Sequence, residues 1–557
     1  MNTSEAPFDP VELIRRRFSE AGLELRGVER RDYPEEIIFI ARTDQLSTPV
    51  ATSLANEIDR ELADRGIKAF VTVRSAETET TTTHGPLKRG VADPRSRSLV
   101  NLVTARARTS EAQPSLAYIP DSAETISTAV TPRHHLIFGR RGAGKTALML
   151  ETRRLIEEGD NLSLWVNLQT YRRESADRTF AWVCQQLCER VQSHYAGRQI
   201  TPHILTLVAP LRDQLERFTS SPESSDAHNF IPKMHALIRR FVEISAVRLF
   251  IFLDDFHYLP RNDQPKLLDM LHAMVRDGDA WLKIAGIKHL SRWFQLHPPT
   301  GLQTGHDADE INLDVTLEDP FHAKVFLERV LGRYAENVGI PSLSAVFSGQ
   351  ALDRLVLASG GVPRDYLVLS ARAVREAQGR ENARIVGVQD VNKAAGEAAK
   401  AKIDELEDDA ASDEKIAAAI VKGLQMVRTF CIEEKSCTYF RVDFRERETC
   451  SAEYGIIQDL MDLRLFHLVE SSLSDEREAG RRSEVYTLDL SQFSGQRLKR
   501  RLKVLDFISG HIVLKETGTT KAVRAGDTPK QRLGILRRGP LLELKGLQTI
   551  VEGVGGA

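Results

Sequence analysis

Residues 139–146 combine glycines, a lysine and a threonine at a spacing that can hold the phosphates of a nucleotide. This stretch is a complete G-x-x-x-x-G-K-[ST] motif, and it consists of Gly139, Arg140, Arg141, Gly142, Ala143, Gly144, Lys145 and Thr146. In such a loop the backbone N–H groups close around the phosphates, the lysine reaches the β- and γ-phosphate oxygens, and the threonine hydroxyl ligates Mg²⁺. The motif therefore predicts a site for ATP and Mg²⁺.

The residues on both sides of this loop favour the strand and the helix that the motif requires. Residues 134–138 form a short apolar run, and a helical pattern begins at Thr146 and ends at Gly159. Because the motif lies between a strand and a helix, a chance glycine turn is a poor explanation for it.

Two carboxylates follow an apolar strand about 110 residues further along the chain. Residues 247–253 are typical of a buried strand, and Asp254 and Asp255 come directly after it. We expect Asp254 to hold Mg²⁺ and Asp255 to orient the attacking water. A glutamate at the second position would reach one methylene further, and a misplacement of about 1 Å can cost ~100-fold in rate. Asp255 therefore predicts slow turnover or dependence on a partner.

Three more polar residues are candidates for contact with the phosphates. His289, after the apolar run 283–287, could touch the γ-phosphate or the water, as could its neighbour Lys288. Arg292 could stabilise the transition state in cis or across a subunit boundary, or it is an ordinary surface arginine. Arg364 lies at a helix start after two glycines and Pro363, where it would face the phosphates unless the segment is only a Gly-Pro helix start.

The alternation of helices and apolar strands predicts an α/β fold with a parallel sheet covered on both faces. At 557 residues the chain has room for three or four domains. We expect the following parts: an N-terminal α/β module (1–74), a linker with an Arg-rich segment (75–112), a P-loop ATPase core (113–318), a helical lid (319–403), an acidic hinge or helix end (404–414), a winged-helix domain (415–493) and a basic C-terminal tail (494–557).

Composition excludes several classes of protein. Lys and Arg number 76 against 78 Asp and Glu, so any nucleic-acid role has to come from a local basic patch. Five cysteines without a C-x-x-C pair argue against a zinc site or a disulfide framework, and Cys184 and Cys188 fit a helix core. No apolar run approaches membrane-spanning length, so we expect a soluble, cytoplasmic protein with no membrane partner.

One local basic patch is present near the C-terminus. Between Ser491 and Ile550 there are thirteen Lys or Arg residues and four acids, and 474–483 is a polar hairpin with three arginines. A winged helix docks a helix in the major groove of double-stranded DNA and lays its hairpin on the phosphates. The helix expected over 452–464, however, carries three acids and one arginine, so packing against the nucleotide domain is an equal alternative.

These motifs resemble the ORC/Cdc6-like and STAND branches of the AAA+ ATPases over roughly 65% of the chain. The matching parts are the phosphate loop, the strand ending in Asp254 and Asp255, the strand before Lys288 and His289, the lid entry 317–320 and the 360–364 segment. The paired aspartates look more like the STAND pattern, and initiators favour asparagine where Lys288 and His289 stand. The resemblance implies a nucleotide-dependent switch, and in bacteria such chains often serve phage-defence or mobile-element systems.

Three functions remain open at this point. The chain could be an initiator- or loader-like ATPase that acts on DNA. It could instead be a signalling scaffold that forms a homo-oligomer on ATP and acts through an effector protein. The N-terminal module could also be an enzyme, although its acids Asp32, Glu35, Glu36 and Asp44 form no recognisable catalytic set.

Overall fold

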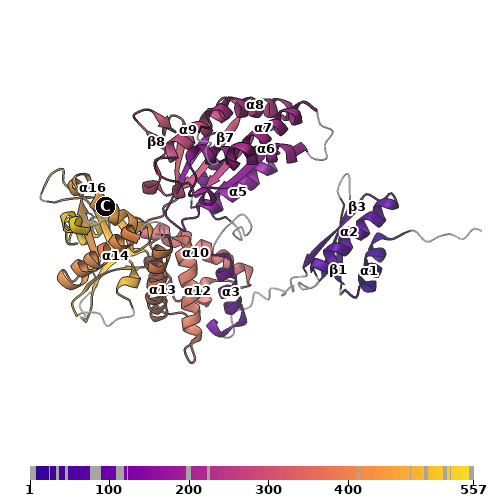
Figure 1. The fold of residues 1–557 in the computed structure, drawn as a ribbon. Coiled ribbons are helices and arrows are strands. Elements are labelled where there is room, and N and C mark those ends of the chain that lie inside the picture. The colour runs from indigo at the N-terminus through magenta and orange to yellow at the C-terminus, as the bar shows by residue number, and fades with distance from the viewer. Residues whose placement is uncertain are drawn as a thin grey trace, which may run out of the picture. The chain divides into compact units, whose positions relative to one another are not determined.

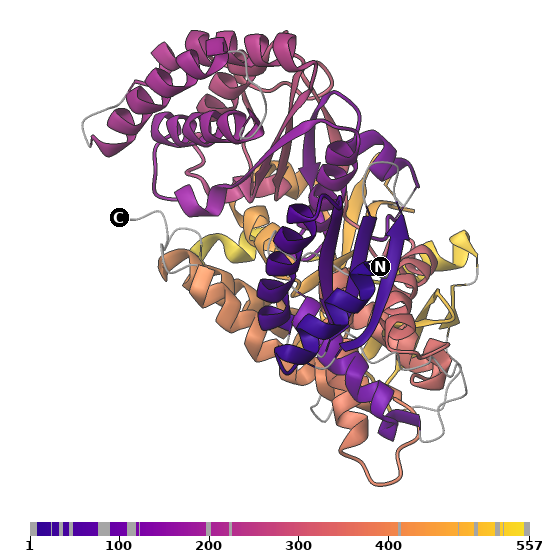
Figure 2. The same ribbon diagram turned by 90° about the vertical axis from the view of Figure 1, so that its right-hand side faces the viewer.

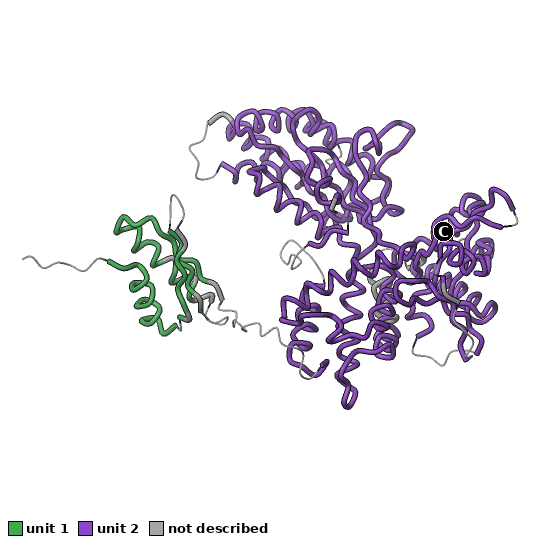
Figure 3. Tube along the Cα trace, turned by 180° about the vertical axis from the view of Figure 1, so that it is seen from behind, with its two compact units in different colours: residues 1–85 green, residues 86–557 purple. Residues whose placement is uncertain are grey.

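The computed structural model divides into two compact units, residues 1–85 and 86–557 (Figure 3). None of the described helices has the length and apolar character that crossing a bilayer requires. The structure describes the following residues: 8–23, 25–32, 37–43, 48–75, 90–107, 118–121, 123–195, 202–221, 226–409, 414–476, 478–494, 500–518, 524–526 and 528–550.

The first unit is a three-stranded sheet with two helices. Its elements are α1 (Pro10–Glu20), β1 (Leu25–Asp32), β2 (Ile37–Thr43), α2 (Thr48–Asp64) and β3 (Ala69–Ser75). Strand β2 is central, antiparallel to β1 and parallel to β3. The helices and the two apolar strands were predicted, but β1 was not, because its sequence LRGVERRD has only two large apolar side chains. Glu35, Glu36 and Asp44, named above as acids of this module, lie outside the described residues.

The region that was predicted to be the P-loop core contains a five-stranded parallel sheet with the strand order β10-β4-β7-β6-β5. This confirms the predicted fold class. The sheet and its helices comprise α4 (Ala123–Ala129), β4 (His134–Phe138), α5 (Lys145–Glu158), β5 (Leu162–Asn167), α6 (Ala176–Tyr195), α7 (Pro202–Ser220), α8 (Ile231–Ser245), β6 (Leu249–Asp254), α9 (Gln264–Val275), β7 (Ala280–Gly286) and β10 (Ala308–Asn312).

Both faces of this sheet are covered, which explains the continuous apolar sequence of its strands. Phe250 and Phe252 of β6 point to the face that α4 and α5 cover. Leu249, Ile251 and Leu253 alternate with them and pack against α6, α8 and α9. Helices α6, α7 and α8 all come after β5 and before β6 along the chain. Figure 2 shows this group of helices at the top of the view. Cys184 and Cys188 are buried in α6 as expected.

The connection from β7 to β10 contains the short hairpin of β8 (Phe294–Gln295) and β9 (Thr300–Gly301). A helical lid then follows, composed of α10 (Pro320–Asn337), α11 (Gly349–Ser359), α12 (Pro363–Gln378) and α13 (Val388–Asp409) (Figure 1). The acidic hinge was expected over 404–414, and its first residues, up to Asp409, are the last residues of α13. Residues 410–413 lie outside the described residues.

Helix α3 (Pro94–Arg106) belongs to the lid. Leu99, Val100 and Val103 of this helix are buried in the lid's core, although the sequence analysis placed the helix in a linker segment. Its apolar residues are interleaved with Arg95, Arg97 and Arg106, which hid the buried stripe. Residues 76–89 and 108–112 of that predicted linker, and the first residues of the predicted core, 113–117, lie outside the described residues.

The C-terminal region contains the two helices and the hairpin that were expected, together with one more strand, β11, and one more short helix, α15. In chain order these are α14 (Glu414–Arg428), β11 (Tyr439–Asp443), α15 (Phe444–Thr449), α16 (Ser451–Asp462), β12 (Phe466–Ser474) and β13 (Arg482–Leu488). Strand β13 lies between β11 and β12 and is antiparallel to both. A single π-helical turn, Thr429–Glu434, follows α14.

The stretch after residue 494 is folded where it is described, which corrects the expectation of a tail. It contains β14 (Lys503–Ile508), β15 (His511–Glu516), β16 (Arg524–Ala525) and α17 (Pro529–Leu536). This stretch covers the free edge of β11: Arg441 N donates to Pro540 O at 2.8 Å, and Leu542 N donates to Arg441 O at 2.8 Å. An uncovered edge would invite pairing with other chains. Arg497, Lys499 and Lys521 of the basic patch lie outside the described residues.

Removal of residues 495–557 should therefore destabilise the C-terminal region. The deletion takes away the buried side chains of Leu502, Leu505, Leu536, Leu542 and Leu544, which together contribute on the order of 10 kcal/mol, comparable to the stability of a domain. We expect an aggregating or partly unfolded product in circular dichroism and size-exclusion chromatography. Removal of residues 1–85, a separate unit, serves as the control and should leave the rest folded. A stable, monodisperse 1–494 chain would contradict this expectation.

Candidate functional site

The phosphate loop lies between the end of β4 and the start of α5, as the sequence predicted. Gly142 and Gly144 adopt φ angles of +83° and +102°, which residues other than glycine rarely adopt. A Cβ atom at Gly142 would also lie 2.8 Å from the Cβ of Arg364. The loop thus approaches the start of α12 closely, and glycine is required at this position.

Oxygen ligands suited to Mg²⁺ meet at the start of α5. Thr146 Oγ1 donates to Asp254 Oδ2 at 2.8 Å, so the two predicted metal ligands are in direct contact. Hydroxyl and carboxylate oxygens are the ligands that Mg²⁺ prefers, and the residues present therefore fit this ion. Burial, together with the neighbouring Asp255 charge, raises the pKa of the Asp254 carboxyl to about 6.

Asp255 is held in an uncommon backbone conformation next to Asp254. Its φ is +59°, in the left-handed region, where a non-glycine residue usually has a functional or structural reason to be. Asn167 Nδ2 at the end of β5 donates to Asp255 Oδ2 at 3.4 Å. Burial raises the pKa of this carboxyl as well. Two adjacent strand ends thus position Asp255 at the edge of the phosphate loop.

A cavity of about 540 Å³ extends from the phosphate loop to the lid. This volume lies within the ~300–1,000 Å³ that small-molecule sites commonly occupy. The lining includes the loop residues 141–146, together with Asp255 and Arg364. It also includes apolar and aromatic side chains, namely those of Tyr118, Ile119, Phe326, Val330, Tyr334 and Leu367. The cavity can therefore bind a polyphosphate next to a planar base.

The backbone carbonyls of the phosphate loop accept hydrogen bonds from different parts of the chain. Lys145 Nζ donates to the carbonyls of Gly139 at 2.7 Å and Arg140 at 3.1 Å. Arg464 Nη1, just after α16, donates to Arg141 O at 3.3 Å. Arg364 N, in the first turn of α12, donates to Gly142 O at 3.3 Å. The loop is thus attached to the lid and to the C-terminal region directly.

Arg140 belongs to the phosphate-loop motif, but its side chain leaves the cavity. The guanidinium is buried, and it donates to Asp314 Oδ1 at 3.2 Å, Val315 O at 2.9 Å and Gly360 O at 3.1 Å. Arg140 therefore ties the loop to the segment that enters the lid. Of the two predicted loop arginines, only Arg141 lines the cavity.

The structure separates the four residues that were predicted to be catalytic. Asp255 and Arg364 line the cavity, whereas His289 and Arg292 do not belong to its lining in the described part of the chain. The backbone N–H of Arg292 donates to Gln264 Oε1 at 2.6 Å. Lys288 forms an ion pair with Glu310 of β10.

His289 lies between two carboxylates of α16. Its Nε2 is 3.1 Å from Asp459 Oδ1, and its Nδ1 is 2.8 Å from Asp462 Oδ2. Burial alone would lower the pKa of the imidazole, but the hydrogen bonds to these carboxylates raise it to about 9. The ring is therefore protonated at neutral pH and holds α16 against the core. With this face packed, α16 cannot enter a DNA groove in the arrangement seen here.

A buried ion-pair network lies behind the phosphate loop. The Asp365 carboxylate on α12 contacts Arg464 Nε at 3.0 Å and Lys402 Nζ at 3.4 Å. Lys402 also contacts Asp489 at 3.0 Å, and Asp489 contacts His467 Nε2 at 2.7 Å. The two cations lower the pKa of Asp365 although burial opposes them. The network joins the lid to the C-terminal region.

Several cavity residues were missed by the sequence analysis. Tyr118 comes before α4, Phe326 and Tyr334 are on α10, and His257 follows Asp255 by two positions. The aromatic residues gave no local signal, because an apolar residue on a helix reads as core whether it faces the interior or a ligand. His257, however, stands next to the predicted carboxylates and could have been considered with them.

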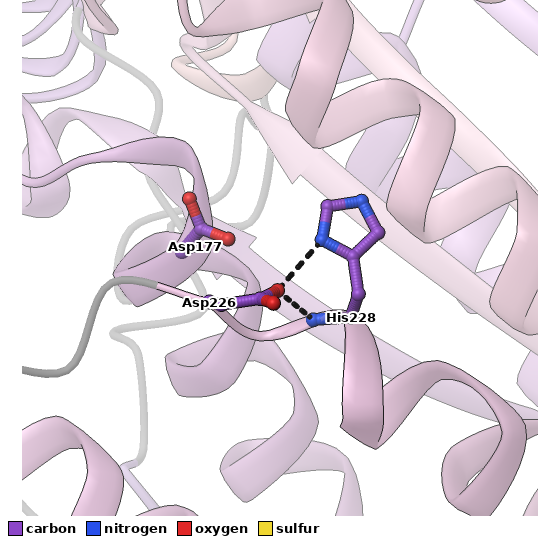
Figure 4. Close-up of side chains that lie close together, drawn as sticks. All are labelled: Asp177, Asp226 and His228. Carbon is purple, nitrogen blue, oxygen red and sulfur yellow. Dashed lines mark hydrogen bonds and ion pairs between the residues drawn. The ribbon is translucent and has the colours of Figure 1, made fainter.

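Asp177, Asp226 and His228 form a small cluster away from this cavity, and Figure 4 shows the Asp226 carboxylate turned toward the His228 ring and backbone. Asp226 Oδ1 accepts from His228 N at 3.0 Å and lies 2.9 Å from His228 Nδ1. Asp177 accepts from Ala227 N at 3.1 Å and pairs with Lys266. These contacts account for the cluster as the cap of a turn, so we assign no metal to it.

No protein-family model and no curated protein matches the chain. Among solved structures, Cdc6p from Pyrobaculum aerophilum is 14% identical, with 68% of this chain and 93% of that chain covered and a TM-score of 0.32. Orc1 from Aeropyrum pernix, solved with DNA, is 15% identical (74% and 92% covered, TM-score 0.31). A Thermotoga maritima RuvB variant is 14% identical (61% and 83%, TM-score 0.29). Such low scores carry no inference; the sheet order and phosphate loop identify the P-loop core.

The contact between His289 and α16 should depend on pH. A histidine whose folded pKa of about 9 exceeds its unfolded value of ~6.5 stabilises fully below about pH 6.5, and this stabilisation is lost as pH rises through about 9. We expect His289→Ala to lower the melting temperature at pH 6.5 and to have little effect at pH 9.5. His306→Ala, at an exposed histidine, serves as the control. Equal losses at both pH values would refute the ion pair.

Proposed function

We propose that this chain is an ATP-binding, slowly hydrolysing switch of the AAA+ type. Its nucleotide state would set the position of the C-terminal region relative to the core and lid. The observation that carries this proposal is the phosphate loop, whose consecutive carbonyls are bonded by Lys145, by Arg464 of the C-terminal region and by Arg364 of the lid. A ligand that moves this loop changes contacts in both other regions.

In the proposed complex Lys145, Thr146 and Asp254 hold the triphosphate and Mg²⁺. When bound, the ion neutralises phosphate charge and fixes the orientation of the terminal phosphate. The loop N–H groups bind the phosphates, and Arg364 faces them from the start of α12. Asp255 orients the attacking water, and its left-handed backbone and short side chain support slow turnover. The aromatic side chains of the cavity lining are suited to the adenine base.

The switch would control engagement of double-stranded DNA. The order of α14, β11, α15, α16, β12 and β13 is that of a winged helix, which supports this role. Described cations that remain exposed near it are Arg500, Arg501, Lys503, Lys530, Arg538 and Lys545. Because α16 is packed against the core, DNA would bind through the hairpin and these side chains, or after α16 is released.

A scaffold that assembles into a homo-oligomer on ATP and engages an effector protein is the second candidate. It is favoured by the ion pairs that occupy part of the basic patch: Arg532 contacts Glu470 at 3.2 Å, Arg537 contacts Glu476 at 2.7 Å and Lys515 contacts Asp506 at 2.5 Å. These pairs reduce the charge available for phosphate contacts. A role in bacterial defence or in mobile elements would be compatible with either candidate.

The decisive experiment compares wild type with Lys145→Ala. We expect the variant to lose ATP binding in calorimetry and to hydrolyse ATP at least ~100-fold more slowly, because it lacks the cation at the phosphates. ATPase rate and mass are measured with and without double-stranded DNA. DNA-stimulated, salt-sensitive turnover supports the DNA role, and a mass that changes with ATP alone supports the scaffold. Wild type that binds no ATP with Mg²⁺ would overturn the proposal.

Arg464 provides a test of the coupling between regions. Arg464→Lys keeps a positive charge near Asp365 but lacks the second guanidinium nitrogen that reaches Arg141 O. Loss of a hydrogen bond from a charged group, worth ~1.5–3 kcal/mol, should speed nucleotide release about tenfold or more in stopped-flow displacement. Arg333→Lys, at an exposed helix position, is the matched control. An unchanged release rate would argue against coupling through this contact.

A further inference from the structure

His257 lies beside the part of the cavity where the end of a phosphate chain would be. It follows Asp254 and Asp255 in a short 3-10 turn, Phe256–Tyr258, and it lines the cavity together with Arg141, Lys145 and Asp255. The neighbouring Tyr258 ring lies 4.5 Å from the imidazole, centroid to centroid. The turn and this ring contact fix the imidazole at the edge of the phosphate loop.

The imidazole has hydrogen-bonding capacity that the protein does not use. His257 Nδ1 is buried and has no hydrogen-bond partner among the residues that the structure describes. Buried polar atoms are nearly always bonded, and an exception at the wall of a cavity indicates a group that a ligand completes. Two of the positively charged residues that line the cavity, Arg141 and Lys145, affect this ring electrostatically.

The surroundings keep this ring neutral. Burial lowers the pKa of His257 well below its ordinary value, and the positive charges of Lys145, Arg141 and His289 lower it further. A neutral imidazole donates from one nitrogen and accepts at the other, so it can bond a phosphate oxygen and a water molecule simultaneously. This capacity suits a residue that contacts a terminal phosphate and the water beside it.

His289, which the sequence analysis placed in this role, is already engaged. Both of its ring nitrogens contact carboxylates of α16, and it does not line the cavity in the described part of the chain. His257, which lines the cavity, is therefore the better candidate for contact with a phosphate.

We propose that His257 contacts the terminal phosphate of a bound nucleoside triphosphate and thereby distinguishes the triphosphate from the diphosphate. This inference rests on the proposed nucleotide site and adds a residue that the motifs do not include. His257 lies three residues after Asp254 and lines the cavity together with Lys145.

The test compares the affinities of full-length variants for ATP, a nonhydrolysable ATP analogue and ADP, each with Mg²⁺. His257→Phe keeps the ring contact with Tyr258 but removes both nitrogens, and His257→Gln restores an amide that can bond a phosphate oxygen. We expect His257→Phe to lower the ATP-to-ADP affinity ratio about tenfold while ADP affinity stays within twofold. His257→Gln should recover part of the ratio.

Two controls separate this inference from the function on which it rests. His306→Ala, at an exposed histidine, should leave the ratio unchanged, and His289→Ala should also leave it within twofold because it lies outside the cavity. Wild type without ATP binding would overturn the proposed function itself. If wild type binds ATP but His257→Phe keeps the full ratio, or loses ATP and ADP affinity equally, the assignment of His257 is wrong. Thermal melts confirm that each variant is folded.

Discussion

Asp365 carries a buried carboxylate that is tolerated only because two cations from distant parts of the chain reach it. Arg464 follows α16 and Lys402 lies on α13, and both contact this carboxylate within 3.4 Å. Removing one member of a buried ion pair costs roughly 3–5 kcal/mol of stability, because the remaining charge is then buried without a partner. Asp365 directly follows Arg364, at the point where the lid meets the phosphate loop. The relation between lid, core and C-terminal region depends on this charge balance.

The parts of the site that the sequence predicted are those with local signatures. A phosphate loop needs eight consecutive residues, and the strand that ends in Asp254 is recognisable from its apolar composition and the carboxylate after it. Both signals are contained in one element and its boundary, and the structure brings Thr146 and Asp254 into contact as expected. The parallel sheet was predictable for the same reason: buried parallel strands are apolar on both faces, so each strand is a continuous apolar run in the sequence.

The errors arose where a side chain's role depends on residues far along the chain. His289 is 170 residues from Asp459, and no local pattern shows that α16 would occupy its ring. The charge of the C-terminal stretch was counted along the sequence, yet the acids that neutralise Arg532 and Arg537 belong to the hairpin of β12 and β13. The same limit applies to the folded stretch after residue 494, in which Pro540 and Leu542 bond to Arg441 on the edge of β11, about 100 residues earlier in the chain.

Coupling in this molecule has to be reciprocal. Arg141 O accepts a hydrogen bond from the C-terminal region, and Gly142 O accepts one from the lid, within the loop that holds the phosphates. If nucleotide binding changes the free energy of these contacts, a partner that withdraws α16 must change nucleotide affinity by the same factor. A DNA duplex or a second protein could each exert this effect, because only its differential contact with the two arrangements matters. The partner therefore need not approach the cavity to control it.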